Sequence, residues 1–99
     1  MDIEIDQIYT LKLNSGEELV AKIVEATDKE LTISEPVSVG PGPQGMALVP
    51  SLFTADHDKP IIINKQSIAI YAQTDESVRT KYIQATTGIS VPDKKILMS

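Results

Sequence analysis

Apolar and polar residues alternate along the first third of the chain. The alternation runs through residues 9–13, 19–24 and 31–34, and a period of two is typical of a strand with one buried face. Turn-forming residues separate these segments at 14–16 and 27–30. The sequence therefore predicts a meander of three longer strands.

The second and third predicted strands of this meander should both depart from a straight, regular strand. Both faces of residues 19–24 are partly apolar, so we expect this strand to curve between two packing surfaces. Pro36 follows the third alternating segment directly. Because proline cannot donate a ladder hydrogen bond, it should weaken or bend the third strand.

Two shorter apolar segments, residues 61–63 and 68–71, are joined by the polar residues 64–67, here called the polar hinge, which are too few to form a free loop. Three longer strands followed by two short ones outline a small, strongly bent antiparallel barrel. We expect a mainly β fold of five strands, a barrel of the SH3-like shape, over residues 1–73.

The middle of the chain is rich in glycine and proline. Residues 39–45 contain the Gly-Pro-Gly-Pro run, which is unfavourable in a regular strand and predicts a long, solvent-exposed loop. The apolar stretch 46–53 that follows is interrupted by Pro50. We expect it to be bulged or to lie at a sheet edge.

The last quarter of the chain predicts one helix. Thr74 or Asp75 can cap its start, Gly88 can end it, and apolar residues recur between them at spacings of three and four. We expect residues 74–99 to form this C-terminal helix and an extended tail. This part should pack on the barrel or on a neighbouring subunit.

The composition indicates one cytoplasmic domain. The chain has 99 residues, of which 41% are hydrophobic and none is cysteine, so disulfides and thiolate metal sites are excluded. Its first residues are acidic where a signal peptide is basic, and no apolar run reaches the length of a membrane span. We expect no membrane association.

Catalytic and metal-binding chemistry have little support in the sequence. The single histidine, His57, lies between Asp56 and Asp58. Three adjacent side chains point in alternating directions, so a solvated loop is favoured over a metal site. No serine lies in a Gly-x-Ser-x-Gly pattern. We expect no enzyme activity, no metal and no cofactor.

Charge is distributed unevenly along the chain, whose net charge is −5. Residues 1–35 carry nine acidic side chains against three lysines, and the remaining residues carry five acidic against six basic side chains. Non-specific binding of a duplex depends on neutralising many phosphates, so the whole chain is a poor candidate for that role. A localised site that is repeated by symmetry stays open.

Two segments resemble motifs of the Sm-like family, which includes the Sm, LSm and Hfq proteins. Residues 9–23 resemble the first motif, with Ala21 where the family usually has glycine, and residues 63–68 resemble the second, normally Ile-Arg-Gly-Asn/Asp. Residues 50–56 and the long middle loop are similar to Sm-like proteins of marine cyanophages. The resemblance implies a role in phage or bacterial RNA or DNA processing.

The resemblance also implies a set of nucleic-acid-binding residues. Sm proteins bind RNA with two turns that line the pore of a ring. The second turn maps onto Asn64, Lys65 and Gln66, and the first onto Asp28 and Lys29. Lysine replaces the family's arginine, so the planar bidentate donor is lost. The resemblance implies weaker or differently specified binding of single-stranded RNA or DNA.

Unpaired strand edges indicate how copies of the chain would associate. Pairing the fourth strand of one copy with the fifth strand of the next satisfies both open edges of a five-stranded sheet. Such a head-to-tail contact closes into a ring or grows into a filament, and the family implies a homo-oligomeric ring of about five to seven copies. The predicted interface residues are Ile61, Ile62, Ile63, Ile68 and Ile70.

Two functions from different classes remain open at this point. One is a ring that binds single-stranded RNA or DNA from its pore. The other is a structural or adaptor ring whose partners are proteins, which the overall acidity, the few aromatic residues and the missing arginine favour.

Overall fold

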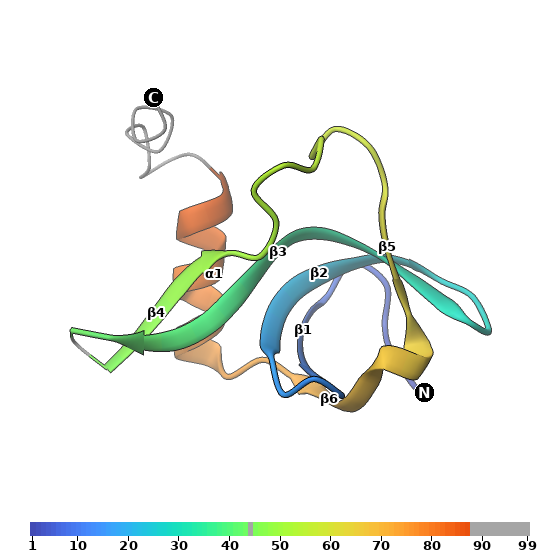
Figure 1. The fold of residues 1–99 in the computed structure, drawn as a ribbon, viewed down its shortest axis with the longest axis horizontal. Helices are drawn as coiled ribbons and strands as arrows, with labels where there is room; N and C mark the ends of the chain where they lie inside the picture. Colours follow the sequence, from blue (N-terminus) through green and yellow to red (C-terminus); the bar gives the residue numbers. More distant parts are fainter. Residues whose placement is uncertain (44, 88–99) are drawn as a thin grey trace.

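The computed structural model of the chain describes residues 1–43 and 45–87, which form a single sheet and one α-helix (Figure 1). The elements are β1 (Ile8–Leu13), β2 (Glu18–Ala26), β3 (Glu30–Gly42), β4 (Gly45–Pro50), β5 (Ile61–Asn64), the 3-10 helix η1 (Lys65–Ser67), β6 (Ile68–Gln73) and α1 (Glu76–Thr87). The predicted mainly β fold with a C-terminal helix is confirmed. The described residues contain six strands, so the predicted number of five is wrong.

All strands of the described residues belong to one antiparallel sheet. Its order is β4-β3-β2-β1-β6, and β5 pairs with β3 beside this path. β1, β2 and β3 form the predicted meander, and β4 lies at a sheet edge, as expected from Pro50. Within residues 1–43 and 45–87, β5 and β6 are not paired with each other. The sheet is therefore open between these two strands.

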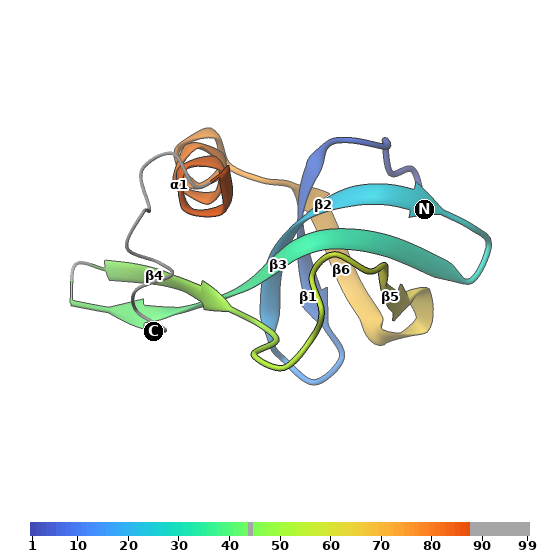
Figure 2. The ribbon, with the colours of Figure 1, turned by 90° about the horizontal axis from the view of Figure 1, so that it is seen from above.

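β3 pairs with two different strands on the same side because it bends near its middle. Residues 30–33 pair with β5, and residues 37–42 pair with β4. Between them, Glu35 has a φ of 51°, in the left-handed region that few residues other than glycine adopt. The register between β2 and β3 also shifts close by. The predicted bend at Pro36 is confirmed, and Figure 2 shows how strongly the long strands curve.

The prediction of a long loop over residues 39–45 is wrong. β3 runs to Gly42 and β4 begins at Gly45, so most of this segment lies in paired strands, while residue 44 lies outside the described part. A Cβ on Gly42 would meet the Ala47 Cβ at 3.0 Å. Glycine is therefore what permits this close pairing. Pro41 is tolerated because, among the described strands, only β4 flanks this end of β3.

Apolar side chains are buried on both faces of β2, as its sequence predicts. Ala21 and Ile23 belong to the larger cluster, whereas Val20 faces a second cluster that includes Tyr82 of α1. The other members of the larger cluster are Tyr9, Leu11, Leu19, Leu31 and Ile33. Figures 1 and 2 together place α1 on one side of the sheet and the loop of residues 51–60 on the other.

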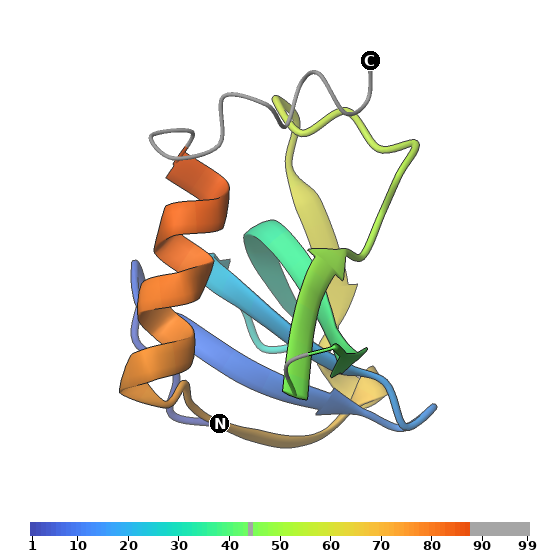
Figure 3. The same cartoon turned by 90° about the vertical axis from the view of Figure 1, so that its left-hand side faces the viewer.

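The helix lies close to its predicted bounds. Asp75 precedes α1, and its carboxylate accepts hydrogen bonds from the Ser77 N–H at 3.1 Å and the Ser77 hydroxyl at 2.6 Å. These hydrogen bonds lower the pKa of Asp75. α1 packs on the sheet through Val78, Tyr82 and Ile83. Figure 3 shows the helix beside the sheet. The predicted tail, including Lys94 and Lys95, lies outside the described residues.

Tyr82 ties α1 to the sheet at the irregular point between β2 and β3. Its hydroxyl donates a hydrogen bond to the Ser34 carbonyl oxygen at 2.9 Å and accepts one from the Lys22 N–H at 3.2 Å. Lys22 and Ser34 pair at the edge of the register shift. The hydroxyl therefore supplies partners to two part-buried backbone groups where the ladder is disturbed.

We expect Tyr82→Phe to destabilise the fold and to change how its stability depends on pH. Burial raises the pKa of Tyr82, with a further rise from Glu35, against the lowering effect of the Lys22 hydrogen bond. The unfolded chain releases this proton above about pH 10, while the folded chain retains it. The stabilisation is therefore complete below about pH 10 and falls by about 1.4 kcal/mol per pH unit above it.

Urea unfolding of both proteins at about pH 8 and about pH 11 measures this effect. At the lower pH we expect a cost of about 1–3 kcal/mol, because two backbone groups lose their partner. At the higher pH the cost should shrink. The control is Tyr71→Phe, since the Tyr71 hydroxyl binds the Asp2 N–H at the exposed surface. An equal cost of Tyr82→Phe at both pH values would contradict the prediction.

Candidate nucleic-acid interface

Two turns that are distant from η1 in sequence contact it in the fold. The Lys65 N–H donates to the Lys29 carbonyl oxygen at 2.8 Å, which joins η1 to the turn between β2 and β3. The Asn14 N–H donates to the Ser67 carbonyl oxygen at 2.8 Å, and the Asn14 amide nitrogen donates to the Gln66 carbonyl oxygen at 2.6 Å. The polar hinge is therefore held from two sides by backbone contacts.

η1 itself is fixed by the residue that precedes it. Asn64 has extended backbone angles, φ −79° and ψ 130°, and its side-chain oxygen accepts the Gln66 N–H at 2.8 Å. The Ile68 N–H donates to the Lys65 carbonyl oxygen at the other end. The Asn64 oxygen thus has a structural role as a cap. The side chains of Lys65 and Gln66 form no hydrogen bond in the described residues.

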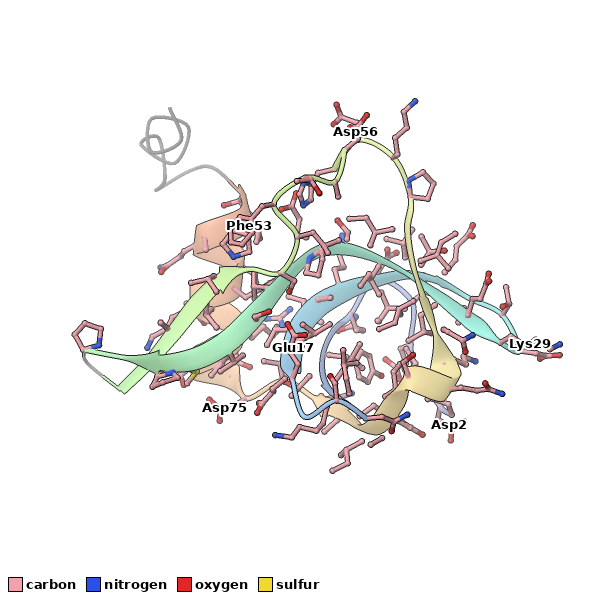
Figure 4. The ribbon with its side chains drawn as sticks, in the orientation of Figure 1. Asp2, Glu17, Lys29, Phe53, Asp56 and Asp75 are labelled. Carbon is pink, nitrogen blue, oxygen red and sulfur yellow. The ribbon has the colours of Figure 1, made fainter. Side chains whose placement is uncertain are left out.

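The neighbouring turn is held by Thr27. Its hydroxyl oxygen accepts the N–H groups of Lys29 at 3.3 Å and Glu30 at 3.0 Å, and its own N–H donates to the Glu30 carbonyl oxygen at 2.8 Å. Asp28 and Lys29 are exposed at the tip of this turn. Figure 4 shows Lys29 at the far end of the β2–β3 hairpin.

The charges around these turns are mixed. Lys29 is exposed and Lys65 is half-buried. The one ion pair among the described residues joins Arg79 to Glu76 on α1, at 3.9 Å. Both lysine ammonium groups are therefore without an ion pair in that part of the chain. Asp28 and Glu30 flank Lys29 in sequence, so the local net charge is small.

The structure brings together the residues that the sequence assigned to two separate turns. Asn64, Lys65 and Gln66 lie on η1 or next to it, and Lys29 is joined to them through its backbone. Asp28 lies beside Lys29, and the hydrogen bond to η1 comes from the carbonyl oxygen of Lys29. Asn14 was missed as part of this cluster. Its place in an Asn-Ser-Gly turn explains its position in the chain but says nothing about which distant carbonyl it would bind.

The predicted interface isoleucines divide into two groups. Ile61, Ile63 and Ile68 pack against the larger core cluster. Ile62 and Ile70 remain 55% and 62% exposed, although both lie in strands. The alternation of β5 thus directs Ile61 and Ile63 inward and Ile62 outward. A contact between copies would use mainly Ile62 and Ile70.

His57 lies at a pocket of about 450 Å³ on the β5 side of the sheet. The same pocket is lined by Glu25, Thr32 and Lys59, so it mixes acidic, basic and hydroxyl groups. Residues 1–43 and 45–87 contain no group of three or more histidine or acidic side chains that is arranged to hold a metal ion. The described part of the chain also holds no helix with the length and hydrophobicity of a membrane span.

Comparison with models of known protein families and with curated protein sequences finds no match to this chain. In the described residues, the fold and the turn cluster define a mainly β protein with one α-helix after β6 and a hydrogen-bonded polar hinge between β5 and β6.

Proposed function

We propose that the chain is an Sm-like protein that forms a homo-oligomeric ring and binds single-stranded RNA or DNA at its pore. The observation that carries this proposal is the hydrogen bond between the Lys65 N–H and the Lys29 carbonyl oxygen. It joins the two turns that the resemblance assigns to nucleic-acid binding. The proposed role is binding in the cytoplasm, without catalysis and without a cofactor, in phage or bacterial RNA or DNA processing.

The strand pairing supports the fold part of the proposal. A three-stranded meander, a short strand on β3, a 3-10 turn and a last strand on β1 are consistent with a small β-barrel-like fold. The proposed barrel closes around the larger apolar cluster. η1 would then lie at one end of this barrel, together with the turn that contains Lys29.

Two open strand edges support the ring. In the described residues β5 pairs only with β3, and β6 pairs only with β1. Each therefore has one edge of unpaired backbone groups, and each carries one exposed isoleucine, Ile62 or Ile70. Pairing β5 of one copy with β6 of the next satisfies these groups and buries the isoleucines. Repetition of this contact closes a ring of about five to seven copies.

In the proposed ring, repetition of a weakly charged site raises the positive potential that attracts phosphates. One Lys65 and one Lys29 per copy become a circle of ammonium groups, which focuses positive potential at the pore. Lysine offers phosphates a point charge without bidentate geometry. The Gln66 amide supplies both a donor and an acceptor for base edges. Such a site suits a single strand, because unpaired bases expose these edges.

A titration of a fluorescent oligonucleotide across several salt concentrations tests the proposal. We expect the logarithm of the association constant to fall with the logarithm of the salt concentration, by about 0.7 for each phosphate neutralised. The mass of the complex, measured on the same sample, should correspond to a multimer. Absence of binding at low salt would remove the nucleic-acid part of the proposal, and a monomeric mass would remove the ring.

The second candidate function is an adaptor ring that binds proteins. The observation that favours it is the arrangement of charge, because Asp28 and Glu30 flank Lys29 and offset the positive potential of the hinge. Under this proposal the same titration gives no binding at any salt concentration, while the multimeric mass is retained. The two functions are thus separated by one experiment.

A further inference from the structure

β4 lies at the end of the sheet and has one free edge. Among the described strands it pairs only with β3, and the proposed ring contact uses β5 and β6 instead. Figures 1 and 2 show the hairpin of β3 and β4 extending beyond the strongly curved part of the sheet. A free edge presents backbone N–H and C=O groups that can pair with another strand. The proposed ring therefore leaves the outer edge of β4 open.

The residue that follows β4 shows which backbone groups lie on this edge. The Ser51 N–H donates to the Pro36 carbonyl oxygen at 3.1 Å, so Ser51 directs its backbone groups toward β3. Alternate residues of an antiparallel strand bond to the same neighbour. The odd-numbered residues of β4 therefore bond to β3, and the even-numbered residues direct their backbone groups to the free edge. These even-numbered residues are Met46, Leu48 and Pro50.

β4 also lies in the longest uncharged segment of the chain. Residues 36–55 contain no acidic residue, lysine, arginine or histidine, although 23% of the whole chain is charged. Natural sheets commonly protect an edge strand with charged side chains, lysine above all. β4 lacks this protection, and its Met46 and Val49 side chains are 41% and 47% exposed. Its edge is thus suited to pairing with another uncharged strand.

The sequence of β4 is complementary to itself in antiparallel pairing. A two-fold axis at Leu48 places the Leu48 residues of two copies opposite each other, and it places Met46 of each copy opposite Pro50 of the other. The Met46 and Leu48 N–H groups then each have a carbonyl partner. Pro50 needs only to accept, because it has no N–H. We propose that two copies of this chain associate by pairing their β4 strands in this way.

The side chains that this pairing brings together are apolar. Besides the two leucines, and Met46 against Pro50, Ala47 of each copy lies opposite Val49 of the other. Like charges placed directly opposite each other would oppose the pairing, and the charges of both copies lie outside residues 36–55. A second copy is therefore a suitable partner although each chain carries a net charge of −5. The contact does not depend on the proposed function, because it uses neither β5, β6 nor the polar hinge.

One pair of six-residue strands gives a weak contact. Stable interfaces bury about 1,200–2,000 Å² and smaller ones are transient, so we expect a dissociation constant of about 10⁻⁴ M. Salt screens the repulsion between two negatively charged copies and should lower this constant. Binding to nucleic acid has the opposite salt dependence.

Amide hydrogen exchange of the wild-type protein, measured by NMR at two protein concentrations, tests the proposal. We expect the Met46 and Leu48 N–H groups to exchange about threefold more slowly at about 1 mM than at about 0.05 mM. About four fifths of the chains are paired at the higher concentration and about two fifths at the lower. The Ala47 and Val49 N–H groups bond to β3 within each chain, so their exchange should be slow at both concentrations.

Met46→Lys provides the second measurement. Lysine on a strand edge opposes edge-to-edge pairing, so the concentration dependence at Leu48 should disappear. The substitution makes the net charge less negative, so this loss cannot arise from general repulsion. Slow exchange of Ala47 and Val49 in the variant shows that β4 still pairs with β3. The matched control is Val24→Lys, at an exposed position of β2, which is paired on both sides. It should keep the threefold change.

Three results would overturn the proposal. Fast exchange of Met46 and Leu48 at both concentrations would show an unpaired edge, as expected if β4 instead accepts a strand of another protein. Slow exchange at both concentrations would show that the edge is covered within its own chain. Equal concentration dependence in Met46→Lys and the wild type would place the contact elsewhere. Ile70→Lys, which removes the proposed ring contact, should leave the exchange of β4 unchanged, so the two contacts are tested separately.

Discussion

Lys65→Glu is expected to lower the affinity for single-stranded oligonucleotides by at least about 100-fold at low salt, while the fold and the assembly are retained. The substitution places a carboxylate where an ammonium group was, once in every copy of the proposed ring, so the positive potential that Lys65 would contribute at the proposed pore is replaced by a negative one. η1 should survive, because its bonds to Lys29 and Ile68 use only the backbone of Lys65. Fluorescence anisotropy of a labelled oligonucleotide measures the change.

The matched control for this substitution is Lys81→Glu. Lys81 is exposed on α1, and its replacement changes the net charge by the same amount. We expect it to reduce affinity by less than about threefold, because α1 lies away from the hinge between β5 and β6 (Figures 1 and 2) and salt screens its charge. Equal losses for the two variants would show that only the overall charge matters. Unchanged affinity of Lys65→Glu would exclude η1 as the binding site.

Ile70→Lys is expected to dissociate the proposed ring into monomers at micromolar concentrations. Ile70 lies on β6 at the edge of the sheet and is 62% exposed, so lysine fits the isolated chain at little cost. In the proposed ring the same side chain packs against the next copy. A charge there is buried without a partner, and charged residues on strand edges oppose edge-to-edge pairing.

Sedimentation velocity measures the mass of this variant, and circular dichroism tests whether its fold is intact. The control is Ile5→Lys, at an exposed position outside the strands, which should leave the assembly unchanged. A ring that survives Ile70→Lys would show that β6 is not the contact. Loss of the β spectrum would show that Ile70 supports the chain itself, in conflict with its exposure.

The sequence predicts the parts of this fold whose signals are local. Alternation in residues 9–34 and the turn residues between the segments are enough to place β1, β2 and the start of β3, because a half-buried strand has a period of two. Asp75 marks the start of α1 through its capping bonds to Ser77, and this chemistry involves residues only two positions apart.

The sequence fails where one signal has two structural meanings. Gly42 and Pro41 are typical of loops, yet they lie in a paired strand because Ala47 approaches closely and β3 has a free side there. No pattern within residues 39–45 contains this information. It depends on β4, which begins at Gly45 and continues beyond this segment to Pro50.

The candidate site likewise has parts that the sequence indicates and parts that only the tertiary structure shows. The sequence indicated Lys65 and Lys29 separately, each through a turn, and their proximity follows from the pairing of β3 with β5. The sequence does not indicate the role of Asn14, because its partner, the Gln66 carbonyl oxygen, is 52 positions away. Three similar residues, Ile61, Ile62 and Ile63, could not be sorted into buried and exposed before the register of β5 was known.

The sequence by itself determined that this chain is mainly β, where its meander turns, and that one helix follows the last strand. Only the tertiary structure decided that η1 lies against two distant turns and that Tyr82 completes the hydrogen bonding between β2 and β3. The physical reason is the range of the interactions. Periodicity, capping and turn preference act over a few residues, whereas strand register and side-chain burial depend on segments that meet only in the folded chain.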